Sequence, residues 1–209
     1  MRLSVIVSFL IISSAEHAAS QNAYFKLGQQ AYIDGNFKTA IMQLERARLI
    51  DSTDANALWM LGYSYYHSDN YAKSITAFSK EIVITPGDAH AYYYRAKAQL
   101  HLAGDSQIPS DKEKYLLRSI MDLTKAITIN PTDAKLTIFY QNRGLAYRDY
   151  AMFKLQPNPR FYDKARGIDA LKASIADLQK VLDADKSRDD VSSQIDVSKE
   201  KLATIVGHH

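Results

Sequence analysis

The stretch Ser119-Ile-Met-Asp-Leu-Thr-Lys125 returns later in the chain as Ser174-Ile-Ala-Asp-Leu-Gln-Lys180, with only two positions changed. Related runs stand upstream, at Ser74-Ile75 and, 34 residues before that, at Ala40-Ile41. A fixed period of this size is the signature of a protein built from repeated supersecondary units. The chain is therefore predicted to be a repeat protein.

Small residues recur with the same period. Gly28, Gly62 and Ala96 are spaced by 34 residues, and Gly144 takes the corresponding place in a fourth, longer unit. Glycine inside a helix costs about 1 kcal/mol relative to alanine, so its repeated use needs a packing reason. We expect the two helices of each unit to cross at these positions. The isoleucines that recur on the second helices are expected to form the buried stripe; these are Ile41, Ile75, Ile120 and Ile175.

This pattern resembles the tetratricopeptide repeat, over residues 21–188. The best copy is the second, in which the signature positions are held by Trp59, Leu61, Gly62, Tyr65, Ser74, Phe78 and Pro86. The resemblance implies an all-α fold, a right-handed α-α superhelix of about four helix-turn-helix repeats. The repeats are expected at about 21–54, 55–88, 89–133 and 137–188. Extra residues near 104–111 and 152–163 are expected as loops or helical extensions at one edge.

The last part of the chain, residues 189–206, is predicted to be a capping helix. Its apolar residues, Val191, Ile195, Leu202 and Ile205, follow helical spacing, with the small Ser198 filling a gap in the stripe. A stacked array leaves its last apolar face uncovered. A final amphipathic helix would cover that face and turn a polar side to water.

Composition narrows the function classes. The 209 residues carry a net charge of only +3 and contain no cysteine. A nucleic-acid-binding role is not expected, because it normally requires a dense basic patch. Cysteine-based chemistry is excluded, and His67, His90 and His101 lack metal-ligand spacing. No nucleophile elbow, phosphate loop or dinucleotide fingerprint is present, so neither enzyme activity nor a cofactor nor a metal is expected.

Residues 1–20 have the layout of a secretory signal peptide. Arg2 precedes an apolar run from Leu3 to Ile12, and small residues follow up to Ser20. Ten apolar residues are about half of what a helix needs to span a bilayer. We expect an exported, periplasmic or secreted product with no membrane span after cleavage. A bacterial source is favoured because proline blocks the one Asn-x-Thr acceptor, Asn130-Pro131-Thr132.

The candidate binding residues are mostly aromatic. The resemblance assigns the inner, concave surface to first-helix residues that do not pack inside a unit, which are Phe25, Tyr32, Trp59, Tyr63, Tyr66, Tyr93, Lys97, His101 and Arg148. Trp59, Tyr63 and Tyr66 share one helix face, so they would line a groove. The alternative interpretation is that these rings belong to the core between repeats, as aromatic stripes often do.

The charge is uneven along the chain. Residues 134–188 contain 11 Lys or Arg and 6 Asp or Glu, a local charge of +5. Residues 21–88 contain 6 Lys or Arg and 7 Asp or Glu, a local charge of −1. A basic surface beside an aromatic groove would suit an acidic or carboxylate-terminated peptide. The sequence therefore favours a scaffold or adaptor that binds a protein or peptide segment. The alternative is a carrier for a small apolar or sugar ligand, because aromatic faces stack on both.

Export is directly testable. N-terminal sequencing of the protein purified from its native host should find a first residue within about two positions of Gln21. Recovery of the chain with Met1 intact from the cytosolic fraction would contradict the signal peptide.

Overall fold

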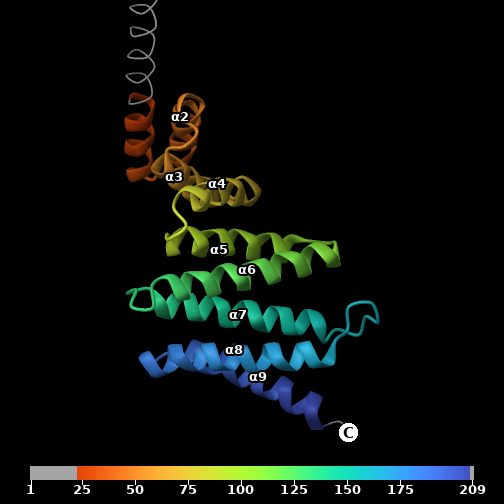
Figure 1. Ribbon diagram of the computed structural model, residues 1–209. Helices are drawn as coiled ribbons and strands as arrows, with labels where there is room; N and C mark the ends of the chain where they lie inside the picture. The colour runs from red at the N-terminus through yellow and green to blue at the C-terminus, as the bar shows by residue number, and fades with distance from the viewer. Residues whose placement is uncertain (1–22, 208–209) are drawn as a thin grey trace, which may run out of the picture. The chain divides into compact units, whose positions relative to one another are not determined.

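The computed structural model describes residues 23–207, and every regular element in this range is an α-helix (Figure 1). The all-helical repeat fold expected from the sequence is confirmed. The chain divides into two compact units, the first ending at Pro86 and the second beginning at Gly87. The expected signal peptide at residues 1–20 lies outside the described residues.

The first unit consists of two helical hairpins. Its helices span residues 23–33, α2 (Phe37–Ile50), α3 (Ala55–Tyr66) and α4 (Tyr71–Ile84). Each labelled helix begins at an Asn or Asp whose side chain accepts a backbone N–H of the first turn: Asn36, Asp54 and Asn70. The turns inside the hairpins use left-handed backbone, at Gly35 (φ 71°) and Asp69 (φ 56°).

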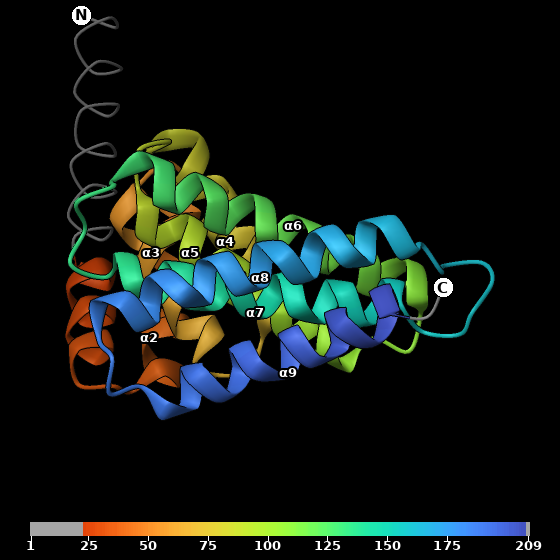
Figure 2. The same ribbon diagram turned by 90° about the horizontal axis from the view of Figure 1, so that it is seen from below.

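The second unit contains two longer hairpins and a final helix. The helices are α5 (Ala89–Asp105), α6 (Pro109–Ile129), α7 (Leu136–Lys154), α8 (Lys164–Ala184) and α9 (Asp189–Gly207). In this unit α5 to α8 lie side by side in chain order, and α9 lies next to α8 (Figures 1 and 2). Val191 and Ile195 of α9 are buried against Leu178 and Val181 of α8. Ser198 is also buried, whereas Val197 on the outer side is half exposed.

The two helices of a hairpin approach each other most closely at the repeated glycines. A Cβ added at Gly62 would lie 2.8 Å from the ring of Phe78 on the partner helix. At Gly28 it would lie 2.6 Å from Leu44 Cγ, and at Gly144 it would lie 2.9 Å from Leu178 Cγ. Real Cβ atoms do not tolerate such distances, so these glycines are required by packing.

The expected isoleucine stripe was wrong by one position. Ile41, Ile75 and Ile175 are only half-buried, and Ile120 alone of the four is buried. The fully buried residues on the second helix of each hairpin are instead those one position before and three positions after the isoleucine. Around Ile75 these residues are Ser74 and Phe78. The Ser74 hydroxyl donates to the Gly62 carbonyl, with an oxygen–oxygen distance of 2.8 Å. Ser74 is therefore buried at this crossing and bonds to the backbone of the helix that carries Gly62.

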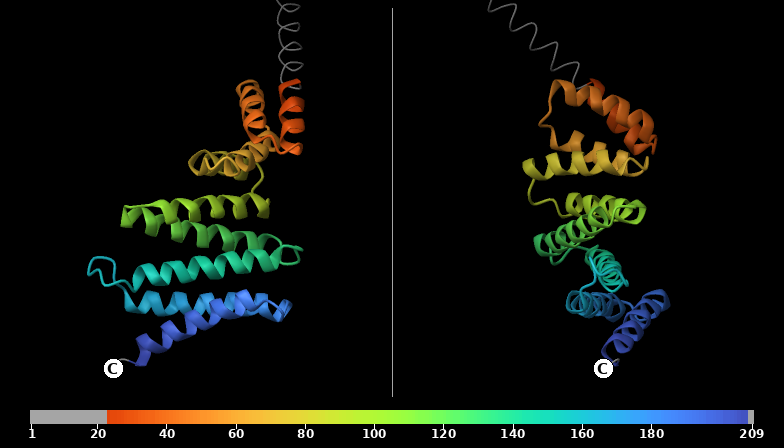
Figure 3. Two further views of the ribbon diagram at one scale, coloured as in Figure 1. Left: turned by 180° about the vertical axis from the view of Figure 1, so that it is seen from behind. Right: turned by 90° about the vertical axis from the view of Figure 1, so that its right-hand side faces the viewer.

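The two insertions have different structures. Near residues 104–111 the extra length continues the helices, so that α5 has 17 residues and α6 has 21, against 12 and 14 in α3 and α4. Near residues 152–163 the chain forms a loop that projects past the ends of α7 and α8 (Figure 3). Phe161 of this loop packs on Phe153 with ring centroids 5.4 Å apart, and the Asp163 N–H donates to the Lys154 carbonyl.

Buried ion pairs between an arginine and an aspartate join helices of the second unit, and sequence analysis did not anticipate them. Arg143 donates to both carboxylate oxygens of Asp177 at 2.6 and 2.8 Å, and Arg95 pairs in the same way with Asp122 at 2.8 and 2.6 Å. Burial alone would lower the pKa of the Arg143 guanidinium, but the hydrogen bonds and charge of Asp177 outweigh it and raise that pKa. Asp122 and Asp177 are the aspartates of the two recurring stretches that define the repeat.

The glycine contacts predict the effect of adding one methyl group. Gly62→Ala should lower the free energy of unfolding by about 1 to 3 kcal/mol, because the added Cβ overpacks the contact with Phe78. The matched control is Gly104→Ala on α5, whose Cβ would meet nothing within 4 Å. That variant should be unchanged or stabilised by up to about 1 kcal/mol through helix propensity. Urea unfolding followed by circular dichroism compares the two; equal stability of Gly62→Ala and the parent would contradict the close crossing.

The ion pairs give a second prediction. Asp177→Ala should cost about 3 kcal/mol of unfolding free energy, because it leaves the Arg143 guanidinium buried without its carboxylate. Asp183→Ala, which removes an exposed carboxylate from the same helix, should change stability by less than about 0.5 kcal/mol. The double variant Arg143→Met with Asp177→Leu should recover most of the loss, because no charge is left buried. If Asp177→Ala costs no more than Asp183→Ala, the pair does not stabilise the fold.

Candidate functional site

The first unit carries a contiguous row of rings, Tyr32, Phe37, Trp59, Tyr63 and His67, which we call the aromatic row. Trp59, Tyr63 and His67 are four residues apart along α3 and its C-cap, so they share one helix face. Trp59 stacks on Tyr63 with centroids 5.4 Å apart, and Tyr63 lies 4.3 Å from His67. Phe37 stacks on His67 at 4.9 Å. Tyr32 meets Trp59 and Tyr63 edge-on at 6.2 and 5.4 Å.

The aromatic row is neither core nor fully solvated. Four of its rings are half-buried, and His67 is exposed. Burial raises the pKa of the Tyr32 phenol, and the neighbouring Tyr63 adds to that effect. Trp59 also meets the buried ring of Phe78 edge-on, with centroids 6.1 Å apart. The row is thus anchored in the core of the first unit and keeps part of each ring accessible.

Two predicted groove residues are in fact buried. Tyr66 is 9% exposed and packs beside Tyr71 and His67, and burial raises the pKa of its phenol. Tyr93 is 8% exposed and packs on Phe139 of α7 with centroids 5.1 Å apart. Tyr93 lies where one hairpin of the second unit stacks on the next. For these two rings the core interpretation is correct.

The other predicted residues are distributed over both units. Phe25 is half-buried and packs on the core of the first unit. It is not a member of the aromatic row. In the second unit, Lys97 and His101 line a hollow of about 210 Å³ between α5 and α7. Arg148 pairs with its neighbour Asp149 at 3.3 Å. The structure therefore brings together Tyr32, Trp59 and Tyr63, and a single groove that also includes the second-unit residues stays a prediction.

Sequence reasoning missed Phe37 and His67 as members of the row. From the sequence, His67 is considered as a metal ligand and rejected in that role, although its spacing of four from Tyr63 places it on the same helix face. Phe37 follows the turn at Gly35 and begins α2, a position that the repeat period alone does not link to α3. Its stacking on His67 depends on how the first hairpin packs on the second.

The described range contains neither a metal-binding cluster nor a helix that could span a membrane. Between residues 23 and 207, no three His, Asp or Glu side chains gather in a way that could hold a metal ion. None of the helices in that range combines the length and hydropathy needed to cross a bilayer.

The sequence matches no protein-family model, and no curated protein resembles it significantly. Solved structures do. MamA from Desulfovibrio magneticus RS-1 superposes with a TM-score of 0.64 at 18% identity, covering 90% of each chain. A thermophilic TPR protein of Thermus thermophilus, TTC0263, gives a TM-score of 0.52 at 19% identity, covering 85% of this chain and 98% of that one. PilF of Pseudomonas aeruginosa superposes with a TM-score of 0.51 at 16% identity, covering 91% of this chain and 73% of that one. This chain therefore has the fold of a tetratricopeptide repeat solenoid.

Proposed function

We propose that the chain is an exported scaffold that binds a segment of a partner protein, and that the aromatic row is the contact surface. Helical repeat solenoids of this fold typically mediate protein interactions through the faces of their stacked helices. The observation that carries the proposal is the row itself, in which five rings from three helices share a surface and remain partly accessible.

The chemistry of the row suits a protein segment. Trp and Tyr are the residues that most often dominate binding energy at interfaces, because they bury a large area and carry one polar group. The rings of Trp59, Tyr63 and His67 already stack on one another. Their side-chain torsions are therefore largely fixed before binding, which reduces the entropy lost when a partner docks.

Charge favours a division of roles between the two units. The first unit is close to neutral, so its aromatic row selects for apolar or planar groups rather than for acid. The excess of Lys and Arg lies in residues 134–188, where it suits an acidic part of the same or another partner. Export rests on the layout of residues 1–20 and would place the partner outside the cytosol.

Site-specific crosslinking tests the surface. A benzophenone amino acid placed at position 67, the exposed end of the row, should capture the partner in the native host. The same amino acid at Lys38, which is exposed on α2 and outside the row, is the matched control and should not. A peptide from the crosslinked region should then change the fluorescence of Trp59, the single tryptophan of the chain.

The affinity of that peptide decides the proposal. Trp59→Ala and Tyr63→Ala should each cost about 2 kcal/mol, close to 30-fold in Kd, and Lys38→Ala should cost little. Circular dichroism must show that each variant is folded under the binding conditions, because Trp59 also contacts Phe78. Unchanged affinity in both folded variants would reject the aromatic row. A free sugar or small apolar ligand that changes Trp59 fluorescence as strongly as the peptide would instead favour the carrier function.

A further inference from the structure

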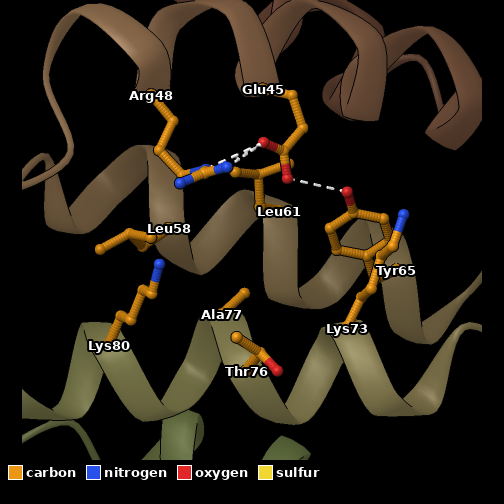
Figure 4. Close-up of a pocket in the computed structure, with 9 residues that line it drawn as sticks. All are labelled: Glu45, Arg48, Leu58, Leu61, Tyr65, Lys73, Thr76, Ala77 and Lys80. Carbon is orange, nitrogen blue, oxygen red and sulfur yellow. Dashed lines mark hydrogen bonds and ion pairs between the residues drawn. The ribbon is translucent and has the colours of Figure 1, made fainter.

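A second feature of the first unit is a pocket that does not involve the aromatic row. Helices α2, α3 and α4 line a half-open cavity of about 210 Å³ (Figure 4). Leu58 and Leu61 of α3 and Ala77 of α4 form its apolar floor, and Arg48, Lys73 and Lys80 stand at its rim. We call this cavity the basic pocket.

The repeats differ at two positions that line this cavity. Leu61 directly precedes the repeated glycine of its unit, as Arg143 does in the second unit. Ala77 stands three residues after the repeated serine, as Asp177 does in the second unit. In the second unit a bidentate ion pair fills this place between the two helices. In the first unit two shorter, uncharged side chains take these positions and line the cavity.

The one carboxylate that lines the pocket is already engaged. Glu45 accepts from the Arg48 guanidinium at 2.5 and 2.9 Å and from the Tyr65 hydroxyl at 2.8 Å, as the dashed lines in Figure 4 mark. Burial, followed by the hydrogen bond to Glu45, raises the pKa of the Tyr65 phenol well above its ordinary value. Tyr65 therefore stays protonated and keeps donating to Glu45, so this carboxylate has little capacity left for the lysines.

Among the residues that the structure describes, the two lysines at the rim have no acidic partner. Within residues 23–207 neither Lys73 nor Lys80 forms an ion pair, and Lys73 Nζ lies 5.4 Å from the centre of the Tyr65 ring. The pocket is thus surrounded by three cations and one carboxylate. Like charges gathered around an apolar cavity repel each other, and an anion bound there would relieve that repulsion.

We propose that the basic pocket binds an acidic segment of a protein, with one branched apolar side chain in the cavity and a carboxylate on each lysine. The volume favours a side chain, because pockets for drug-sized molecules start at about 300 Å³. Lys73 and Lys80 are two helical turns apart, about 10.5 Å along the axis. In an extended peptide, side chains at positions 1, 3 and 5 face the same way and span about 13 Å, within reach of two flexible lysines.

The probe follows from this geometry: the peptide acetyl-Asp-Ser-Leu-Ser-Asp-amide, titrated into the full-length protein labelled with nitrogen-15. Amide shifts should concentrate in residues 58–65 and 73–80. The double variant Lys73→Gln with Lys80→Gln should weaken binding at least tenfold and remain folded, because both side chains are exposed. Lys38→Gln, an exposed lysine of the same unit away from the pocket, is the matched control and should bind like the parent.

Two altered peptides separate the contributions. Replacement of both Asp by Asn removes the charge, and replacement of Leu by Ala removes the apolar anchor; each should weaken binding at least tenfold. The Trp59→Ala variant should bind the probe as the parent does, which separates this site from the aromatic row. No shifts up to millimolar peptide, or equal affinity in the lysine double variant, would overturn the proposal. Equal affinity for 4-methylpentanoate would overturn it too, by assigning the pocket to a small carboxylate.

Discussion

The close approach of two helices at a glycine is the constraint on which each hairpin depends. At Gly28, Gly62 and Gly144 there is no room for a Cβ, because a large apolar side chain of the partner helix fills that space. Leu44, Phe78 and Leu178 are completely buried as a result. Glycine weakens a helix, but here the loss is offset by dispersion contacts that only a bare backbone allows.

The same contact positions the candidate binding surface. Phe78 packs on Gly62 with part of its ring and meets Trp59 edge-on at 6.1 Å. Trp59 in turn begins the line of rings that continues through Tyr63 to His67. The row is therefore connected to the core of the first unit through the contact of Trp59 with Phe78.

The period of the sequence predicted which residues are equivalent, but not how each helix is rotated. That is why the glycine crossings were found while the buried stripe was placed on Ile75 rather than on Ser74 and Phe78. A period also cannot separate a ring that faces solvent from one that packs in the interior, and Tyr66 and Tyr93 were misplaced for this reason. The recurring Asp122 and Asp177 were visible, but their partners Arg95 and Arg143 lie on another helix, and no local pattern connects the two.

The repeats share a backbone plan and differ in what fills the space between their helices. In the second unit, an arginine before the small residue and an aspartate after the serine pair across each hairpin, and they fix the helices through directional bonds. In the first unit, Leu61 and Ala77 take those positions, and both line the basic pocket. The two lysines beside it are not neutralised by Glu45, because that carboxylate is engaged by Arg48 and Tyr65. The first unit thus lacks the arginine–aspartate pair and instead has two lysines without acidic partners beside an apolar cavity. An external group that is both anionic and partly apolar would complement this surface.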